Sequence, residues 1–161
     1  MSSPRLRLAV TGLNGQVVSA IIERAHKGVE IIALGRPQLE LSHREAVLSS
    51  LRHAGCDVII NAAAYTQVDR AESEPELAMR VNGEGAGNVA QAAAELGVPL
   101  LHLSTDYVFD GMLDIPYRED DATHPTSVYG RSKLAGEEYI RAMHSDHVIL
   151  RLSLIHISEP T

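Results

Sequence analysis

The stretch AVTGLNGQVV, residues 9–18, joins a short apolar run to an amphipathic one. The apolar run RLRLAVT predicts a buried strand, and the run that begins at Gly15 predicts a helix. Gly12 permits a tight turn between the two, and Gly15 lets the backbone approach a ligand at the N-terminus of the helix. A strand, a glycine turn and a helix in this order indicate the first unit of a dinucleotide-binding fold.

The same alternation of strand and helix continues along the chain. Short apolar runs at 29–35, 56–62, 98–104 and 147–151 are separated by helix-like stretches at 44–53, at 75–96 and through Tyr129. This alternation predicts right-handed crossovers and a parallel, doubly wound sheet of Rossmann-like α/β type. The ligand crevice of such a sheet lies at the carboxyl ends of its strands. We therefore expect an NAD(P)-binding domain over residues 1–151.

The last ten residues, LSLIHISEPT at 152–161, break this pattern. They resemble the translation of an adapter sequence read through at the end of a sequencing fragment, and the alternative is a genuine short tail. We expect residues 152–161 to be a non-native, adapter-derived tail, and they are excluded from the fold prediction.

Length and composition restrict the class of protein. A chain of 161 residues has the size of one domain. Its apolar residues, 45% of the total, form no long run, so no membrane span is expected. The N-terminus has too few apolar residues for a signal peptide. The single cysteine, Cys56, fits a reducing compartment, and we expect a cytoplasmic protein.

Charge and histidine spacing exclude further classes of ligand. The formal net charge of −7 and the pI of about 5.6 argue against nucleic acid or anionic membrane as partners, because both require a basic face. The eight histidines show no metal-binding spacing, and no metal is predicted.

Two positions modify the dinucleotide motif. Val18 stands where a third glycine would be, and a branched side chain there should push the helix slightly off the sheet. The second strand ends in Leu34, Gly35 and Arg36, without the carboxylate that usually binds the ribose of NAD. The planar fork of Arg36 suits a 2′-phosphate, so NADPH is favoured over NADH. The alternatives are an ordinary glycine turn and a solvated turn arginine.

A second group of polar residues gathers at the end of the fourth predicted strand. Thr105 and Asp106, in STDYVFDG, should project into the mouth of the crevice. Tyr129 and Lys133 lie four residues apart, which places both on one face of a helix. A ketone that accepts a hydride from a cofactor also needs a proton, which Tyr129 can donate. Lys133 should lower the pKa of this phenol and bind the nicotinamide ribose, while Thr105 orients the keto oxygen. The alternative is a half-exposed surface pair.

Together with these motifs, the chain resembles the extended short-chain dehydrogenases and, within them, the dTDP-4-dehydrorhamnose reductases. The resemblance extends from about Leu6 to Arg151. Its motifs are NAAAYTQVDRAESEPELA from Asn61, VNGEGAGN from Val81, STDYVFDG from Ser104, PYRED from Pro116 and PTSVYGRSKLAGE from Pro125. It implies NADPH-dependent reduction of dTDP-4-dehydro-6-deoxy-L-mannose (dTDP-4-dehydrorhamnose) to dTDP-L-rhamnose, by a protein that forms a homodimer when complete.

The resemblance also implies roles for individual residues. The implied catalytic residues are Thr105, Tyr129 and Lys133, and the implied substrate contacts are Thr105 and Asp106. Asn82 matches a superfamily helix pattern with Gly85 and Asn88, and we expect a structural role for it. The implied cofactor contacts are Gly12, Asn14, Gly15, Gln16 and Val17 at the pyrophosphate, Arg36, Glu40 and Leu41 at the adenosine end, Ala64, Tyr65 and Thr66 in the middle, and Leu103, Tyr129 and Lys133 at the nicotinamide.

Two departures from the family pattern affect these expectations. Some relatives have a magnesium-binding glutamate at the position of Ala20, and an alanine cannot replace it. Family members also run to nearly twice this length, so we expect the domain to be incomplete, the substrate domain to be missing and the fragment to be inactive. Two other readings stay open: a regulatory subunit like the beta subunit of methionine adenosyltransferase, and another extended nucleotide-sugar reductase or epimerase. The presence of all three catalytic residues speaks against the first and Arg36 against an epimerase.

Overall fold

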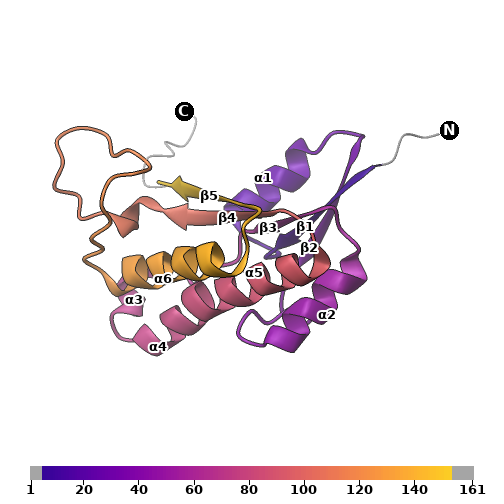
Figure 1. Cartoon of the computed structure of the whole chain (residues 1–161), viewed down its shortest axis with the longest axis horizontal. Coiled ribbons are helices and arrows are strands. Elements are labelled where there is room, and N and C mark those ends of the chain that lie inside the picture. Colours follow the sequence, from indigo (N-terminus) through magenta and orange to yellow (C-terminus); the bar gives the residue numbers. More distant parts are fainter. Residues whose placement is uncertain (1–4, 154–161) are drawn as a thin grey trace.

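The computed structural model describes residues 5–153 as a parallel sheet with helices on both faces (Figure 1). The strands lie in the order β2-β1-β3-β4-β5. Their bounds are β1 Leu6–Thr11, β2 Val29–Leu34, β3 Val58–Asn61, β4 Leu100–Thr105 and β5 His147–Leu152. The main helices are α1 Gln16–Arg24, α2 Arg44–Ala54, α5 Gly85–Leu96 and α6 Val128–Met143. Shorter segments are α3 Val68–Ala71, α4 Pro75–Ala78, a π-helical turn Met79–Glu84 and a 3₁₀ turn Asp106–Val108.

The strand order confirms the predicted doubly wound fold. From β1 the chain runs through α1 to β2 on one side, and it then returns through α2 to β3 on the other side of β1. Figure 1 shows α2, α5 and α6 along one face of the sheet and α1 on the opposite face. The order reverses between β1 and β3, so their carboxyl ends flank the crevice where a ligand is expected.

The last strand extends beyond its predicted end. Leu152 pairs with Thr105 as the final residue of β5, one residue past the boundary predicted at Arg151. The remainder of the predicted adapter-derived tail, from residue 154 onward, lies outside the described residues. Within residues 5–153, no helix is long and apolar enough to cross a membrane.

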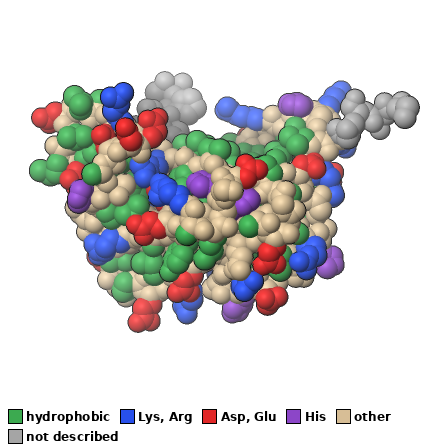
Figure 2. Space-filling model, in the orientation of Figure 1, with side chains coloured by type: hydrophobic (Ala, Val, Ile, Leu, Met, Phe, Trp, Pro, Cys, Tyr) green, Lys and Arg blue, Asp and Glu red, His purple; other side chains and the backbone are tan. Residues whose placement is uncertain are grey.

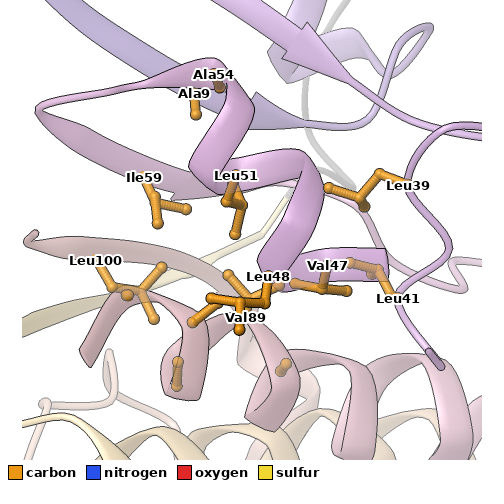
Figure 3. Close-up of a cluster of buried hydrophobic side chains, with 14 of the residues drawn as sticks. Ala9, Leu39, Leu41, Val47, Leu48, Leu51, Ala54, Ile59, Val89 and Leu100 are labelled. Carbon is orange, nitrogen blue, oxygen red and sulfur yellow. The ribbon is translucent and has the colours of Figure 1, made fainter. Parts of the chain in front are cut away.

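The hydrophobic core fills the space between the sheet and α2 and α5. Figure 3 shows Leu48 and Leu51 of α2 together with Ile59 of β3, Val89 of α5 and Leu100 of β4. The predicted helical stretch at 75–96 is present as α4, the π-helical turn and α5 in succession. Its glycines and alanines allow close packing, because a β-carbon on Gly85 would lie 2.9 Å from the β-carbon of Leu41.

The other face of the sheet is only partly covered. The alternation of β5 turns Ile149 toward the core cluster and leaves Val148 and Leu150 on the α1 side, where they are 54% and 40% exposed. Ile22 of α1 is 48% exposed on the same side. Figure 2 shows hydrophobic side chains along the upper edge of this view, near α1 and β5. This apolar sheet face therefore has little cover within the described residues.

A buried carboxylate fixes α6 to the sheet. Glu137 is fully buried, and its two oxygens accept hydrogen bonds from Ser104 of β4 at 2.6 Å and from Arg151 of β5 at 2.7 and 3.0 Å. Arg141, one turn further along α6, donates to Glu137 at 2.9 Å. Burial alone would raise the pKa of Glu137, but the hydrogen bonds from Arg151, Ser104 and Arg141 hold it below its ordinary value. The guanidinium of Arg151 also lies over the ring of Phe109, 4.9 Å from its centroid.

The substitution Glu137→Gln should lower the free energy of unfolding by about 3 kcal/mol, because it leaves Arg151 without its buried counter-charge. Urea unfolding at pH 7 would measure the change. The matched control is Glu138→Gln, since Glu138 is the adjacent residue and is exposed. Equal stability of the two variants would contradict the role given to this carboxylate.

Candidate active site

A cavity of about 510 Å³ opens at the carboxyl ends of the strands. Its volume is in the range of small-molecule and cofactor sites. It brings together many of the residues that the sequence predicted: Gly15, Gln16, Val17, Ala64, Thr66, Leu103, Thr105, Asp106, Tyr129 and Lys133. The other lining residues are Val18, Ala62, Val68, Ser104, Tyr107 and Leu152.

The glycine turn forms one end of this cavity. Gly12 has a φ of 104°, which disfavours any residue with a β-carbon, and its amide donates to the carbonyl of Leu34 at 2.6 Å. α1 begins directly after Gly15, with no side-chain cap and no acidic residue in its first turn. The first amides of the helix and its positive dipole end therefore suit a pyrophosphate. Val18 is buried and packs against Gly12, so the turn accommodates the branched side chain.

Thr11 and Asn61 join β1 to β3 where the strand order reverses. The hydroxyl of Thr11 donates to Oδ1 of Asn61 at 2.7 Å and accepts from the amides of Ala62 and Ala63 at 3.1 and 3.0 Å. These bonds position the loop that contributes Ala62, Ala64 and Thr66 to the cavity wall. The sequence analysis missed both residues. The available signal was a polar residue at the last position of each of two neighbouring strands.

Lys133 is buried, which excludes the alternative of a half-exposed surface pair. It is 2% exposed, and its Nζ donates to the carbonyl of Leu103 at 2.6 Å. Burial lowers its pKa to about 8, although Glu137 acts in the opposite direction. Nζ also lies 3.4 Å from Nε2 of His102, a residue that the sequence analysis did not select.

Tyr129 stands one turn before Lys133 in the first turn of α6. Ser127 caps this helix by accepting a hydrogen bond from the amide of Gly130 at 3.0 Å. The Tyr129 ring meets that of Tyr107 edge to face, with centroids 5.6 Å apart. Thr105 donates to Asp106 at 3.1 Å and accepts from the amide of Tyr107 at 3.2 Å. The phenol, the hydroxyl and the ammonium thus share one cavity wall.

The expected effect of Lys133 on the phenol is wrong for the structure described. The pKa of Tyr129 is raised, first because burial disfavours the phenolate and then through the nearby Asp106 and Tyr107. A hydrogen bond with Thr105 acts in the opposite direction without reversing the shift. The phenol therefore stays protonated at neutral pH.

Small residues allow α6 to lie directly against its neighbours. A β-carbon on Gly130 would overlap the carbonyl oxygen of Tyr107, and one on Gly136 would overlap that of Asn82. Asn82, in the π-helical turn, donates to Ser132 at 2.9 Å and exchanges hydrogen bonds with the backbone of Tyr65. These contacts fit the structural role expected for Asn82. They also explain the small residues that surround Tyr129 and Lys133 in the sequence.

Several predicted cofactor contacts do not line the cavity. Gly12 and Asn14 belong to the turn that leads to α1, and Arg36 is exposed just beyond the end of β2. Glu40 accepts from Ser42, the side chain of Leu41 is in the core, and the hydroxyl of Tyr65 donates to Glu74 at 2.7 Å. Their roles at a cofactor stay predictions. Among the described residues, no cluster of three or more His, Cys, Asp or Glu side chains could hold a metal ion.

Comparison with known proteins places this site in a family. The model of the RmlD substrate binding domain matches residues 6–160. The chain belongs to this family. A relative from Sinorhizobium fredii, named dTDP-4-dehydrorhamnose reductase, is 54% identical over 151 residues, which are 94% of this chain and 51% of the relative. A protein of the same name from Mycolicibacterium smegmatis is 43% identical over 152 residues. This match covers 93% of this chain and 46% of that protein.

Comparison with a solved structure agrees with the fold. The dTDP-4-dehydrorhamnose reductase of Bacillus anthracis, in complex with NADP, superposes with a TM-score of 0.90 at 34% identity. The match covers 94% of this chain and 54% of that structure. The chain therefore spans about half the length of the curated relatives it matches.

The buried Lys133 should make stability depend on pH. Between its folded pKa of about 8 and its higher value in the unfolded chain, the unfolded state binds more protons, so stability rises with pH. The unfolding free energy of the wild type minus that of Lys133→Met should rise from pH 8 to 10, with a slope approaching about 1.4 kcal/mol per pH unit.

Urea unfolding at each pH would measure this difference. Lys27→Met is the matched control, because Lys27 is exposed and is the other lysine of the chain. This control should keep the wild-type dependence on pH. If the unfolding free energies of the wild type and Lys133→Met changed with pH in parallel, Lys133 would not be the group that causes the pH dependence.

Proposed function

We propose that the chain is the cofactor-binding part of an NADPH-dependent reductase that converts dTDP-4-dehydrorhamnose to dTDP-L-rhamnose. The observation that carries the proposal is the shared cavity, which is lined both by Tyr129, Lys133 and Thr105 and by the N-terminus of α1. The names of the S. fredii and M. smegmatis relatives and the NADP in the B. anthracis structure support it. The single Cys56 fits the cytoplasmic setting that we propose for this reductase.

The residues of the chain have distinct tasks in this reduction. Bound NADPH would supply the hydride. Tyr129 donates the proton that the keto oxygen needs, and its raised pKa keeps that proton in place at neutral pH. Thr105 orients the keto oxygen, with its own hydroxyl held by Asp106 and the amide of Tyr107. Lys133, anchored on the carbonyl of Leu103, faces the cavity, where we expect it to bind the nicotinamide ribose.

The residues proposed to bind the adenosine end of the cofactor account for the proposed preference for NADPH over NADH. The first amides of α1 are the proposed pyrophosphate site. Arg36, exposed beyond β2, is the proposed partner of the 2′-phosphate that distinguishes NADPH from NADH.

Replacement of Arg36 with alanine should weaken NADPH binding about tenfold, since one charge-assisted interaction with the phosphate is lost. The affinity for NADH should stay the same. Fluorescence titration of the purified chain with each cofactor would measure both. Arg24→Ala, at an exposed arginine of α1, is the control and should change neither affinity. An equal loss of affinity for NADPH and NADH would contradict the proposed contact between Arg36 and the 2′-phosphate.

The substitution Tyr129→Phe, made in a protein with the full length of the relatives, should remove most of the activity and leave NADPH binding nearly unchanged. The measurement is oxidation of NADPH in the presence of dTDP-4-dehydrorhamnose. Tyr139→Phe is the matched control, because Tyr139 lies on the same helix and is 41% exposed. Full activity without the phenol hydroxyl would refute the assignment of the acid.

Two further outcomes separate the proposal from its alternatives. Residues 1–151 alone should bind NADPH but turn over no substrate, because most of the sugar-nucleotide pocket is expected in the other half of the protein. A regulatory subunit would bind NADPH at full length and still oxidise none. Turnover by residues 1–151 would contradict the proposed inactivity of the fragment.

A further inference from the structure

A fully buried histidine beside Lys133 has no role in the mechanism above. His102 lies in the middle of β4 and is 1% exposed. Its Nδ1 is 3.0 Å from Nδ2 of Asn61, and its Nε2 is 3.4 Å from Nζ of Lys133. It therefore links the polar contacts at the ends of β1 and β3 to the lysine on α6.

The hydrogen bonds of Thr11 determine which nitrogen of His102 carries a proton. The hydroxyl oxygen of Thr11 already accepts from two amides, so its own proton must go to Asn61. The atom of Asn61 that receives this proton is the oxygen Oδ1, which leaves the amide group Nδ2 to face His102. An amide N–H requires an acceptor, so Nδ1 of His102 is unprotonated and the neutral ring carries its proton on Nε2.

This tautomer presents a donor to Lys133. An ammonium group has only donors, so it cannot bond to the Nε2–H group of His102. Its protons must point to the carbonyl of Leu103 and into the cavity. A neutral amine, in contrast, could accept the Nε2–H bond with its lone pair. The histidine thus favours the neutral amine over the ammonium and leaves the Leu103 carbonyl to orient the ammonium.

We propose that His102 is a positioning residue, held in its Nε2–H tautomer by Thr11 and Asn61, that orients the Lys133 ammonium toward the cavity and reduces its affinity for a proton. The inference rests on the proposed function only for the task of Lys133 in the reaction. It matters there because the Lys133 ammonium faces the cavity, where it is proposed to bind the nicotinamide ribose.

The other charged and titratable groups near Lys133 come from three elements. On α6 they are Tyr129 and Glu137, and Glu137 is neutralised by Arg151 of β5. Beyond the end of β4 they are Asp106 and Tyr107, which line the same cavity. Burial and the charge of Lys133 both hold the pKa of His102 well below its ordinary value, so the ring stays neutral when Lys133 titrates.

The sequence makes a direct test feasible, because Lys27 and Lys133 are its two lysines. In the full chain labelled with ¹³C-lysine, NMR can follow the titration of each separately. His102→Gln can offer a carbonyl oxygen to the ammonium and should raise the pKa of Lys133 by about one, a tenfold gain in proton affinity. The Lys27 signal is the internal reference and should not respond to the substitution.

The control is His144→Gln, which changes a buried histidine that bonds instead to the carbonyl of Val98. It should leave the titration of Lys133 unchanged. His102→Asn keeps a polar partner for Asn61 and withdraws the ring from Lys133, so it should raise the same pKa by a smaller amount. Identical Lys133 titrations in the wild type and both His102 variants would overturn the inference.

A measurement on the unsubstituted chain covers the case in which the variants do not fold. Long-range ¹H–¹⁵N correlation spectra distinguish the two neutral tautomers of a histidine. For His102 we expect the Nε2–H form at pH 7, and the Nδ1–H form or an imidazolium would overturn the inference by itself. No cofactor enters these measurements. A chain that fails to bind NADPH but titrates as expected would refute the proposed function and leave the inference standing.

Discussion

The site depends on how closely α6 approaches the rest of the molecule. Gly130 and Gly136 bring its backbone against the carbonyls of Tyr107 and Asn82, at distances that no β-carbon would permit. The buried Glu137 then holds the helix in this position through Ser104 of β4 and Arg151 of β5. The phenol and the amine that face the cavity are therefore carried on a helix with little freedom to move. Such rigidity is what a site for a defined reaction geometry requires.

Burial shifts the pKa values of Tyr129 and Lys133, the two titratable residues of this helix that line the cavity, in opposite directions. It disfavours the charged form of each, so it raises the pKa of the Tyr129 phenol and lowers that of the Lys133 ammonium to about 8. The phenol stays protonated at neutral pH, while the amine loses its proton at a lower pH than an exposed lysine does. The same loss of water thus keeps the phenol protonated and makes the amine a weaker base, without a strong interaction between them.

The sequence was sufficient to predict the fold and much of the cavity wall. Alternating apolar runs and the glycine turn indicated the parallel sheet, and the four-residue spacing placed Tyr129 and Lys133 on one face of α6. It did not reveal the roles of Asn61 and His102. The role of a polar residue inside a strand depends on its neighbours on other strands, and the sequence alone does not identify these neighbours. It misjudged the pKa of Tyr129 for a similar reason, since the spacing gives proximity but not burial. Leu41 and Tyr65 do not line the cavity. Leu41 packs in the core, and the hydroxyl of Tyr65 donates to Glu74, directly before α4.

The polar chain from Thr11 to Lys133 also affects how the molecule folds. Its three links join residues that are 50, 41 and 31 positions apart in the sequence. Contacts between such distant residues incur the full entropy of loop closure and form only when the strands that carry them have paired. The amides of Ala62 and Ala63 donate to Thr11, the residue at one end of these contacts. Their exchange with solvent hydrogen therefore reports the opening of the whole sheet rather than the local fluctuation of a loop.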